Sequence, residues 1–370
     1  MDRDEFSAWL RLLETPGVGR DSARVLLSRF GSAMAAIEAS TEARKSVIGP
    51  APAAALAAPP PEFEARMEAG WRWLQGADDA AETRDVVAIG DPRYPQALLE
   101  SADPPLLLYV RGRPALLSQP ALAIVGSRNP TAQGLENARA FASHLAGTGW
   151  AVVSGLALGI DGAAHEGALE VGGATIAVVG TGLDRVYPAR HRALARRIAA
   201  HGLLVSEFAI GTPALPPHFP IRNRIIAGMT RGTLVVEAAL HSGSLITARM
   251  AADAGREVFA IPGSIHSPQS RGCHLLIKQG AKLVDKASDI VEELAPVSTP
   301  GSGAAVEAPA TASTKNPVLD ALGYEPMSLD ELIARTGRGA ADLSARLLDL
   351  ELEGRVVRMP GQMFQRVERG

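Results

Sequence analysis

Residues 218–249 read HFPIRNRIIAGMTRGTLVVEAALHSGSLITAR, and this stretch indicates the fold class. Its short apolar run at residues 233–236 is typical of a strand buried on both faces of a parallel sheet. The turn Ser242-Gly243-Ser244 follows within a few residues and opens a predicted helix over residues 244–254. A strand, a glycine- and serine-rich turn and a helix in this order are typical of an open α/β sheet, which binds ligands beyond the carboxyl ends of its strands.

The same stretch carries two features that favour an anion site. Arg222, Asn223 and Arg224 place two guanidinium groups and an amide side by side, and guanidinium groups match phosphate oxygens. The Ser242–Ser244 turn is expected to leave backbone N–H groups unpaired at a helix start, where the helix dipole is positive. The alternatives are an ordinary helix cap and surface arginines without a ligand. Because both features occur in one segment, they favour a site for a phosphodiester chain.

Length and composition limit the class of protein. The 370 residues suffice for one large domain with smaller satellites. The single cysteine, Cys273, excludes an intrachain disulfide and a cysteine-based zinc site, and we expect no metal and no other cofactor. The charged start MDRDE lacks the apolar core of a signal peptide, and no apolar run is long enough to span a bilayer. We therefore expect a soluble, cytoplasmic protein without membrane contact.

The charge is unevenly distributed along the chain. The formal net charge is −3, which by itself argues against a general nucleic-acid binder. Residues 181–250 contain nine arginines, no lysine and only three acidic residues, so this segment carries +6 and the remainder −9. Such a local positive field attracts polyanions to one face of a mildly acidic protein. A solvated helix face is the simpler explanation for Arg196 and Arg197.

Residues 1–75 are predicted to form a small helical domain. Helical patterns at residues 6–13 and 22–30 flank Pro16-Gly17-Val18-Gly19, which resembles the hairpin of a helix-hairpin-helix or SAM-like module. A plain packing unit is an equally good explanation, because no lysine lies near the hairpin. Residues 49–61 are interpreted as a linker since their proline run suits a helix poorly, and a helix is expected over residues 62–74.

Residues 76–295 are predicted to form the main domain. Two apolar runs, at residues 86–89 and 106–110, lead into it. From residue 121 onward strands and helices alternate, which predicts an α/β fold: an extended Rossmann-type, doubly wound parallel sheet with right-handed crossovers. Strands are expected at residues 121–125, 151–154, 174–179, 203–206, 233–236, 258–261 and 282–284.

The C-terminal part is predicted to be a tethered module. Residues 296–316 are rich in Pro, Ser, Ala and Gly and are interpreted as a flexible linker. Residues 317–370 fit three helices and a terminal hairpin, the order of a winged helix. Its seven basic and nine acidic residues favour a protein contact, although Arg355, Arg358 and Arg366 leave DNA binding open.

Four turns are expected at the carboxyl edge of the sheet: Gly126-Ser127-Arg128, residues 155–162, residues 180–184 and residues 241–244. The arginine-rich segment 220–224 is expected to fold over the same rim. A dinucleotide fingerprint is absent, because Arg128 occupies the position that must be free for a pyrophosphate to approach. The turns therefore favour a ligand other than NAD.

The order of motifs resembles a known family. AIVGSRNPT, VVSGLALGIDGAAHEGAL, VVGTGLDRVYPARHRAL, HFPIRNRIIAGM, VVEAALHSGSLITARMA, VFAIPGSI and GCHLLIKQGAKLV follow one another within residues 85–295, as in the DprA/Smf DNA-processing proteins. The resemblance implies a non-catalytic protein that binds single-stranded DNA and forms homodimers. It also implies protection of incoming strands during natural transformation and loading of RecA on them.

The resemblance carries residue roles to this chain. Gly126, Ser127 and Arg128 match the family's GSR turn, while Arg222, Asn223 and Arg224 match its RNR segment; both are implied to line a basic DNA pocket. Ser242, Gly243 and Ser244 match its SGS turn. Some members carry a lysine at the positions of Ala189 and Pro216, and we expect Arg190 to replace the first of these. Phe219 and Tyr187 are candidates for stacking on bases, with core packing as the favoured alternative.

Two other functions remain open from the sequence. The turn leading to Glu237 faintly resembles that of phosphoribohydrolases of the lysine-decarboxylase-like family, so Glu237 could perform acid/base chemistry in a nucleotide-processing enzyme. However, the fuller glycine-rich signature is missing. A role in protein contacts alone, centred on the winged helix, is the other alternative.

Overall fold

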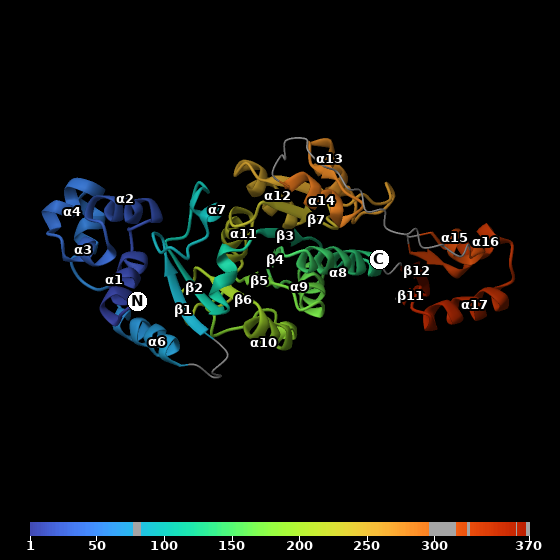
Figure 1. Ribbon diagram of the computed structural model, residues 1–370, viewed down its shortest axis with the longest axis horizontal. Helices are drawn as coiled ribbons and strands as arrows, with labels where there is room; N and C mark the ends of the chain where they lie inside the picture. The colour runs from blue at the N-terminus through green and yellow to red at the C-terminus, as the bar shows by residue number, and fades with distance from the viewer. Residues whose placement is uncertain (77–82, 296–315, 324–325, 360, 368–370) are drawn as a thin grey trace, which may run out of the picture.

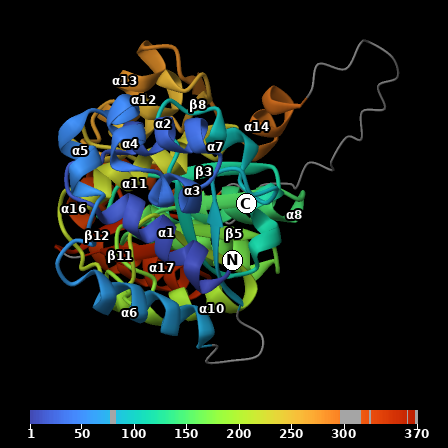
Figure 2. The ribbon, with the colours of Figure 1, turned by 90° about the vertical axis from the view of Figure 1, so that its left-hand side faces the viewer.

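The computed structural model describes residues 1–76, 83–295, 316–323, 326–359 and 361–367. The molecule is elongated, with a helical unit at one end, an α/β domain in the middle and a small helix-and-hairpin module at the other end (Figure 1). Viewed from the helical end, the terminal module lies behind the α/β domain (Figure 2). None of the described helices is long and apolar enough to cross a membrane. The expected linker falls almost entirely outside the described residues.

A nine-stranded sheet forms the centre of the described chain, in the order β1-β2-β6-β5-β4-β3-β7-β8-β9. From β6 to β9 along this order, neighbouring strands pair parallel. The seven strands predicted from residue 121 onward are all present, each within one residue of its expected ends. The strands are β1 (Thr83–Ala88), β2 (Leu107–Gly112), β3 (Ala121–Val125), β4 (Ala151–Ser154), β5 (Thr175–Val178), β6 (Leu203–Ser206), β7 (Gly232–Val235), β8 (Glu257–Ala260) and β9 (Lys282–Leu283).

One edge of the sheet is antiparallel, outside the strands predicted from residue 121 onward. β1 pairs antiparallel with β2, and β2 pairs antiparallel with β6. The two apolar runs expected to lead into the domain are therefore strands of the same sheet. The physical reason is that β2 is buried along nearly its whole length, so its backbone groups need partners, and the otherwise open edge of β6 supplies them.

Helices cover both faces of the sheet. Apolar side chains of α8, α9 and α14 pack with Leu122, Ile124 and Leu234 on one face. Those of α11, α12 and α13 pack with Ala123, Val125 and Val235 on the other. Alternate residues of one strand thus serve opposite layers. The helices are α7 (Gln96–Leu99), α8 (Ala132–Gly147), α9 (Ile160–Glu170), α10 (Arg192–His201), α11 (His218–Gly228), α12 (Ser244–Asp253), α13 (Arg271–Lys278) and α14 (Ala287–Leu294), with short 3-10 turns η1 (Pro114–Ser118) and η2 (Ala189–His191).

The arginine-rich segment 220–224 lies inside α11 rather than in an extended loop. Pro220 is the third residue of this helix, a position in the first turn where the missing N–H has no helical partner to lose. Ile225 and Ile226 are buried against the sheet, which holds the helix in place. The helical geometry sends Arg222, Asn223 and Arg224 in three different directions.

The N-terminal unit contains α1 (Arg3–Glu14), α2 (Arg20–Phe30), α3 (Ala33–Glu38), α4 (Thr41–Ile48), α5 (Pro50–Ala55) and α6 (Phe63–Gln75). The linker interpretation of residues 49–61 was wrong for α5. Its prolines stand at the helix start, where proline is tolerated, and Ala53 and Leu56 are fully buried.

The terminal module contains α15 (Pro317–Leu322), α16 (Leu329–Thr336), α17 (Ala340–Leu352) and a small sheet of β10 (Met327–Ser328), β12 (Met363–Arg366) and β11 (Val356–Met359). The predicted three helices and hairpin of a winged helix are confirmed. β12 touches the α/β domain, where the Ala132 N–H donates to Gln365 Oε1 at 3.2 Å.

Candidate nucleic-acid interface

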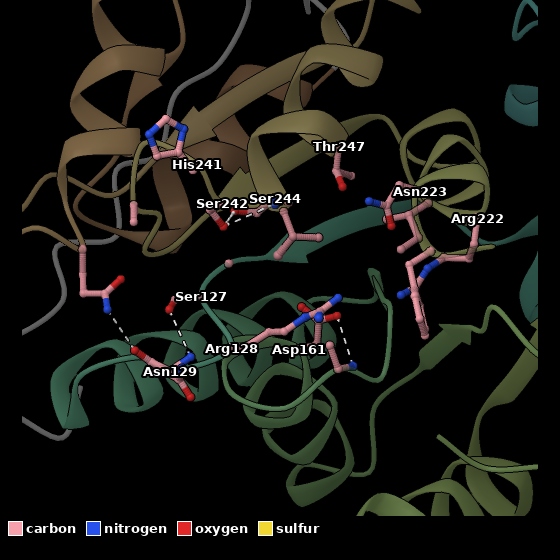
Figure 3. Close-up of a pocket in the computed structure, with 18 residues that line it drawn as sticks. Ser127, Arg128, Asn129, Asp161, Arg222, Asn223, His241, Ser242, Ser244 and Thr247 are labelled. Carbon is pink, nitrogen blue, oxygen red and sulfur yellow. Dashed lines mark hydrogen bonds between the residues drawn. The ribbon is translucent and has the colours of Figure 1, made fainter. Parts of the chain in front are cut away.

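A crevice opens at the carboxyl ends of β3 and β7, which are neighbours in the sheet. The chain leaves β3 for α8 on one face and leaves β7 for α12 on the opposite face, so the two turns diverge. This is the topological switch point at which open α/β sheets bind ligands. The crevice has a volume of about 540 Å³ (Figure 3) and is lined by Val125, Gly126, Ser127, Arg128, Asn129, Ala157, Asp161, Phe219, Arg222, Asn223, Ile226, Ala239, His241, Ser242, Gly243, Ser244, Thr247 and Gln269.

The turn after β3 is held by a dense set of hydrogen bonds. The Ser127 N–H donates to the Glu237 carbonyl at 2.7 Å, and the Asn129 N–H donates to Ser127 Oγ at 3.1 Å. The Gln269 side chain donates to the Asn129 carbonyl at 3.1 Å. Gly126 is required here, because a Cβ would lie 2.9 Å from the Glu237 carbonyl oxygen. The turn therefore presents Arg128 from a fixed backbone.

Arg128 is the exposed cation of the crevice. Its guanidinium carbon lies 5.7 Å from the ring centroid of Phe219, and the Phe219 ring lies 5.5 Å from that of Tyr187. Arg128 makes no ion pair within the described residues. Tyr187 is 53% exposed, so it is not a core residue, while Phe219 is half-buried. Three flat groups thus follow one another at the rim, as stacking on bases requires.

Arg222 forms the floor of the crevice. It is 4% exposed, and its guanidinium donates to the Val178 carbonyl. Burial lowers the pKa of Arg222 to about 10, and Asp161 opposes this effect, so the side chain stays charged at neutral pH. Burial raises the pKa of the Asp161 carboxyl, opposed by Arg222 and by the N–H groups of Ala157 and Gly155. The floor is therefore a buried cation, with the Asp161 carboxyl group acting on it electrostatically.

Arg224 does not line this crevice. It turns to the side of α11 that faces the N-terminal unit, where it pairs with Glu207 and lies 3.3 Å from Asp103. Arg20 of α2 reaches the same two carboxylates, at 3.8 Å and 2.6 Å. The two arginines of the RNR segment are therefore separated, and only Asn223 and Arg222 reach the crevice. In the structure Arg224 helps to connect two domains.

The Ser242–Ser244 turn lies on the wall of the crevice opposite Ser127 and Arg128 (Figure 3). Its hydroxyls are 2.7 Å apart, and α12 begins at Ser244. The expectation of unpaired N–H groups was wrong for Leu245 and Ile246, which donate to the carbonyls of Ser242 and Gly243. Because the tight first turn satisfies these amides, this wall offers hydroxyl groups and the helix dipole.

Arg190 lies outside the crevice, in the exposed turn η2. A small cavity of about 100 Å³ connects the two regions, since Arg128, Phe219 and Arg222 line it together with Tyr187 and Pro188.

Of the eleven site residues expected from the sequence, all but Arg190 and Arg224 lie around one crevice. Sequence reasoning missed Asn129, Asp161, Thr247 and Gln269. Asp161 stands in the expected turn at residues 155–162 and Asn129 directly follows the Gly126–Arg128 turn, whereas nothing in the sequence marked Gln269.

Glu237 has a structural role in the turn. Its carboxylate accepts hydrogen bonds from Thr131 N at 2.9 Å and Thr131 Oγ1 at 2.6 Å. It lines a separate cavity of about 740 Å³ rather than the crevice. A Cβ on Gly134 would lie 2.4 Å from it. Within the described residues, no group of three or more His, Cys, Asp or Glu could hold a metal ion.

We expect Glu237→Ala to lower the free energy of unfolding by about 1–3 kcal/mol, because the start of α8 loses two charge-assisted hydrogen bonds. Urea unfolding measures the change. Glu170→Ala, at an exposed position of α9 without an ion pair in the described chain, should leave stability nearly unchanged and is the control. Equal midpoints for the two variants would contradict the role assigned to Glu237.

Three known protein families match the helical unit, the α/β domain and the terminal module of this chain. Residues 85–295 match the family described as "DNA recombination-mediator protein A". Residues 3–61 match a "DprA-like N-terminal HHH domain", and residues 302–362 match a "DprA winged helix domain". Protein Smf of Escherichia coli is 44% identical over 275 residues, covering 72% of this chain and 74% of that protein. DNA processing protein DprA of Streptococcus pneumoniae is 48% identical over 206 residues, 56% of this chain and 73% of that protein.

Two solved structures are similar to this one. The X-ray structure of DNA processing protein A from Streptococcus pneumoniae aligns with a TM-score of 0.68 at 37% identity, covering 79% of this chain and 98% of that chain. The Helicobacter pylori protein, whose structure concerns its single-stranded DNA binding mode, aligns with a TM-score of 0.52 at 30% identity, covering 57% and 95%.

Fold and crevice together define an extended Rossmann-type protein flanked by a helical unit and a winged helix. The chain belongs to the DprA/Smf family of DNA-processing proteins.

Proposed function

We propose that the crevice binds single-stranded DNA without sequence preference. The observation that carries the proposal is the Arg128–Phe219–Tyr187 stack at the mouth, above the buried cation Arg222. Single strands are held by a positive groove that follows the backbone and by flat side chains on which bases stack. The crevice combines both, whereas a duplex would keep its bases stacked inside and away from Phe219.

We assign the DNA contacts as follows. Arg128 and Arg222 neutralise phosphates, and Asn223 and the hydroxyls of Ser242 and Ser244 donate to phosphate or sugar oxygens. Gly126, Ser127 and Gly243 allow the backbone to approach. Arg190 extends the positive surface beyond the crevice, and Arg224 acts through the position of α11.

In the cell, we propose, the protein protects incoming single strands during natural transformation and loads RecA on them, and it is not an enzyme. The family description as a recombination mediator supports this role, as does the similarity to the Helicobacter pylori protein with its single-stranded DNA binding mode. The role requires a cytoplasmic location. Self-association as a homodimer belongs to the same proposal, and the exposed apolar side chains Leu240, Ile246 and Leu275 around a groove of about 410 Å³ are its candidate surface.

The enzymatic alternative is weaker. The residue considered for acid/base chemistry was Glu237, but both oxygens of its carboxylate accept hydrogen bonds from Thr131, and it lines a different cavity. Turnover of nucleoside monophosphates by the purified protein would favour this alternative and argue against a pure binding role.

Truncation after residue 295 tests whether the crevice is sufficient. We expect the shortened protein to bind a fluorescent single-stranded oligonucleotide within about threefold of full-length affinity, and to prefer it to the duplex, because every assigned contact lies before residue 295. Affinity should fall steeply with salt as phosphate contacts release counterions. Electrophoretic mobility shift and fluorescence anisotropy measure both effects. Loss of binding on truncation would move the site to the winged helix.

A further inference from the structure

Helix α10 carries an unneutralised basic face that the crevice does not include. From Arg185 to Ser206 the sequence contains five arginines, two histidines and no acidic residue. Arg192, Arg196 and Arg197 are exposed. Within the described part of the chain, none of them forms an ion pair or a side-chain hydrogen bond.

On α6, α8 and α17, by contrast, basic side chains have an acidic neighbour: Arg66 lies 2.6 Å from Glu14, Arg139 2.8 Å from Glu166, and Arg346 3.0 Å from Asp342. Glu166 and Glu170 of the adjacent α9 act on Arg139 of α8. Because Arg192 and Arg196 stand four residues apart on one helix, their like charges repel each other. A polyanion would relieve that repulsion.

The basic face begins where the crevice ends. Tyr187 and Pro188 line the small cavity beside Arg128, and Arg190 and then Arg192 follow in the chain. The His191 ring nitrogen Nδ1 donates to the Leu156 carbonyl at 2.9 Å, which fixes the start of α10 against the loop after β4. The first turn of α10 has no capping side chain and no acidic residue. Arg192 and Arg196 lie one turn apart, roughly 6 Å along the helix axis.

We propose that the face of α10 formed by Arg192, Arg196 and Arg197 is a second contact surface for the sugar-phosphate backbone of single-stranded DNA. The strand leaves the crevice past Tyr187 and Arg190 and continues along this face. This inference rests on the proposed function and extends its site. A flexible single strand can turn over the rim of the sheet, whereas a stiff duplex cannot bend on that scale.

Length dependence tests the inference on the full-length protein. Fluorescence anisotropy compares oligothymidylates of about six and about twenty nucleotides, which span the site sizes of comparable binders. We expect Arg192→Gln/Arg196→Gln/Arg197→Gln to weaken binding of the longer strand by about tenfold and to reduce its salt slope by about two, since each phosphate contact on a single strand contributes about 0.7. Binding of the shorter strand should change less than about twofold, because the crevice alone holds it.

Two matched proteins control for net charge and for folding. Arg29→Gln/Arg231→Gln/Lys278→Gln removes three exposed charges that lie outside α10 and the crevice lining and should bind both strands with nearly wild-type affinity. Arg192→Lys/Arg196→Lys/Arg197→Lys keeps the charge and should restore most of the binding of the longer strand.

The possible outcomes separate this inference from the proposed function. Wild-type affinity and salt slope of the glutamine variant for the longer strand would overturn the inference. An equal loss of affinity of the glutamine variant for the shorter and the longer strand would overturn the inference too. If Arg128→Ala leaves both strands bound at full strength while the α10 variant weakens the longer one, the crevice proposal fails and the α10 surface stands.

Discussion

Arg128→Ala should lower the affinity for single-stranded DNA by about 10- to 100-fold, equivalent to about 1.4–2.8 kcal/mol. Arg128 is exposed and lies over the Phe219 ring. Its removal takes away a charge-assisted contact to phosphate and a cation that stacks in line with the aromatic rings. The turn itself should persist, because its hydrogen bonds come from Ser127, Asn129 and Gln269. Anisotropy at several salt concentrations measures the loss.

Arg29→Ala is the control for Arg128, since Arg29 is also exposed and without an ion pair in the described residues. The affinity of Arg128→Lys for single-stranded DNA should lie between those of Arg128→Ala and Arg29→Ala, because lysine keeps the charge but lacks the planar group that stacks. A variant Arg128→Ala that binds DNA at full strength would remove the crevice from the proposed function.

Arg224→Ala should destabilise the protein by about 3 kcal/mol, the second large effect that we expect. The side chains of Arg224 and Glu207 are 15% and 9% exposed. Removing the arginine leaves the Glu207 carboxylate buried, with Arg20 at 3.8 Å as its remaining cation. Urea unfolding measures the loss. Arg224→Met/Glu207→Gln should recover most of the stability, because replacing a whole buried pair costs far less than breaking it.

The loss in Arg224→Ala should depend on pH. Burial raises the pKa of Glu207, and Arg224 opposes this effect. Without Arg224 the folded state binds the Glu207 proton more tightly than the unfolded chain does. Stability should therefore rise as the pH is lowered through the pKa of Glu207 in the folded variant, and fall as the pH is raised. If the free energy of unfolding of Arg224→Ala stays below that of the wild type by a constant amount from pH 8 to about pH 5, the assignment is contradicted.

The double variant also tests the role of Arg224 in DNA binding. If Arg224 acts only by positioning α11, the stable pair Arg224→Met/Glu207→Gln should bind single-stranded DNA with nearly wild-type affinity. Weaker binding by a fully folded double variant would instead favour the direct DNA contact that the family resemblance implies.

Periodicity predicted the parallel strands and the winged helix well, because each of those elements is set by local residue patterns. The strands from β3 to β9 are short runs of buried apolar residues, and such runs are recognisable without knowledge of their neighbours. The errors occurred where tertiary contacts outweigh local preference. β2 became part of the sheet because β6 had an open edge, and α5 formed despite its prolines because Ala53 and Leu56 are buried.

Only the part of the candidate site that is set by local sequence could be predicted. Gly126, Ser127 and Arg128 follow a clear strand, so their place at the carboxyl edge could be inferred. Arg222 and Arg224 are two positions apart in α11, about 200° around the helix axis. Their different surroundings could be known only once the helix was seen between the crevice and the N-terminal unit. Gln269 reaches Asn129 from 140 residues away, and no local pattern indicates such a contact.

The sequence by itself determined the strands from β3 to β9, the family and the segment in which positive charge gathers. Tertiary structure alone decided which arginines face a ligand: Arg128 is exposed beside an aromatic ring, Arg222 is buried at the floor and Arg224 is neutralised by Glu207. The physical reason is that the charge of a guanidinium group is a property of the residue. Its availability depends on burial and on carboxylates that come from distant parts of the chain.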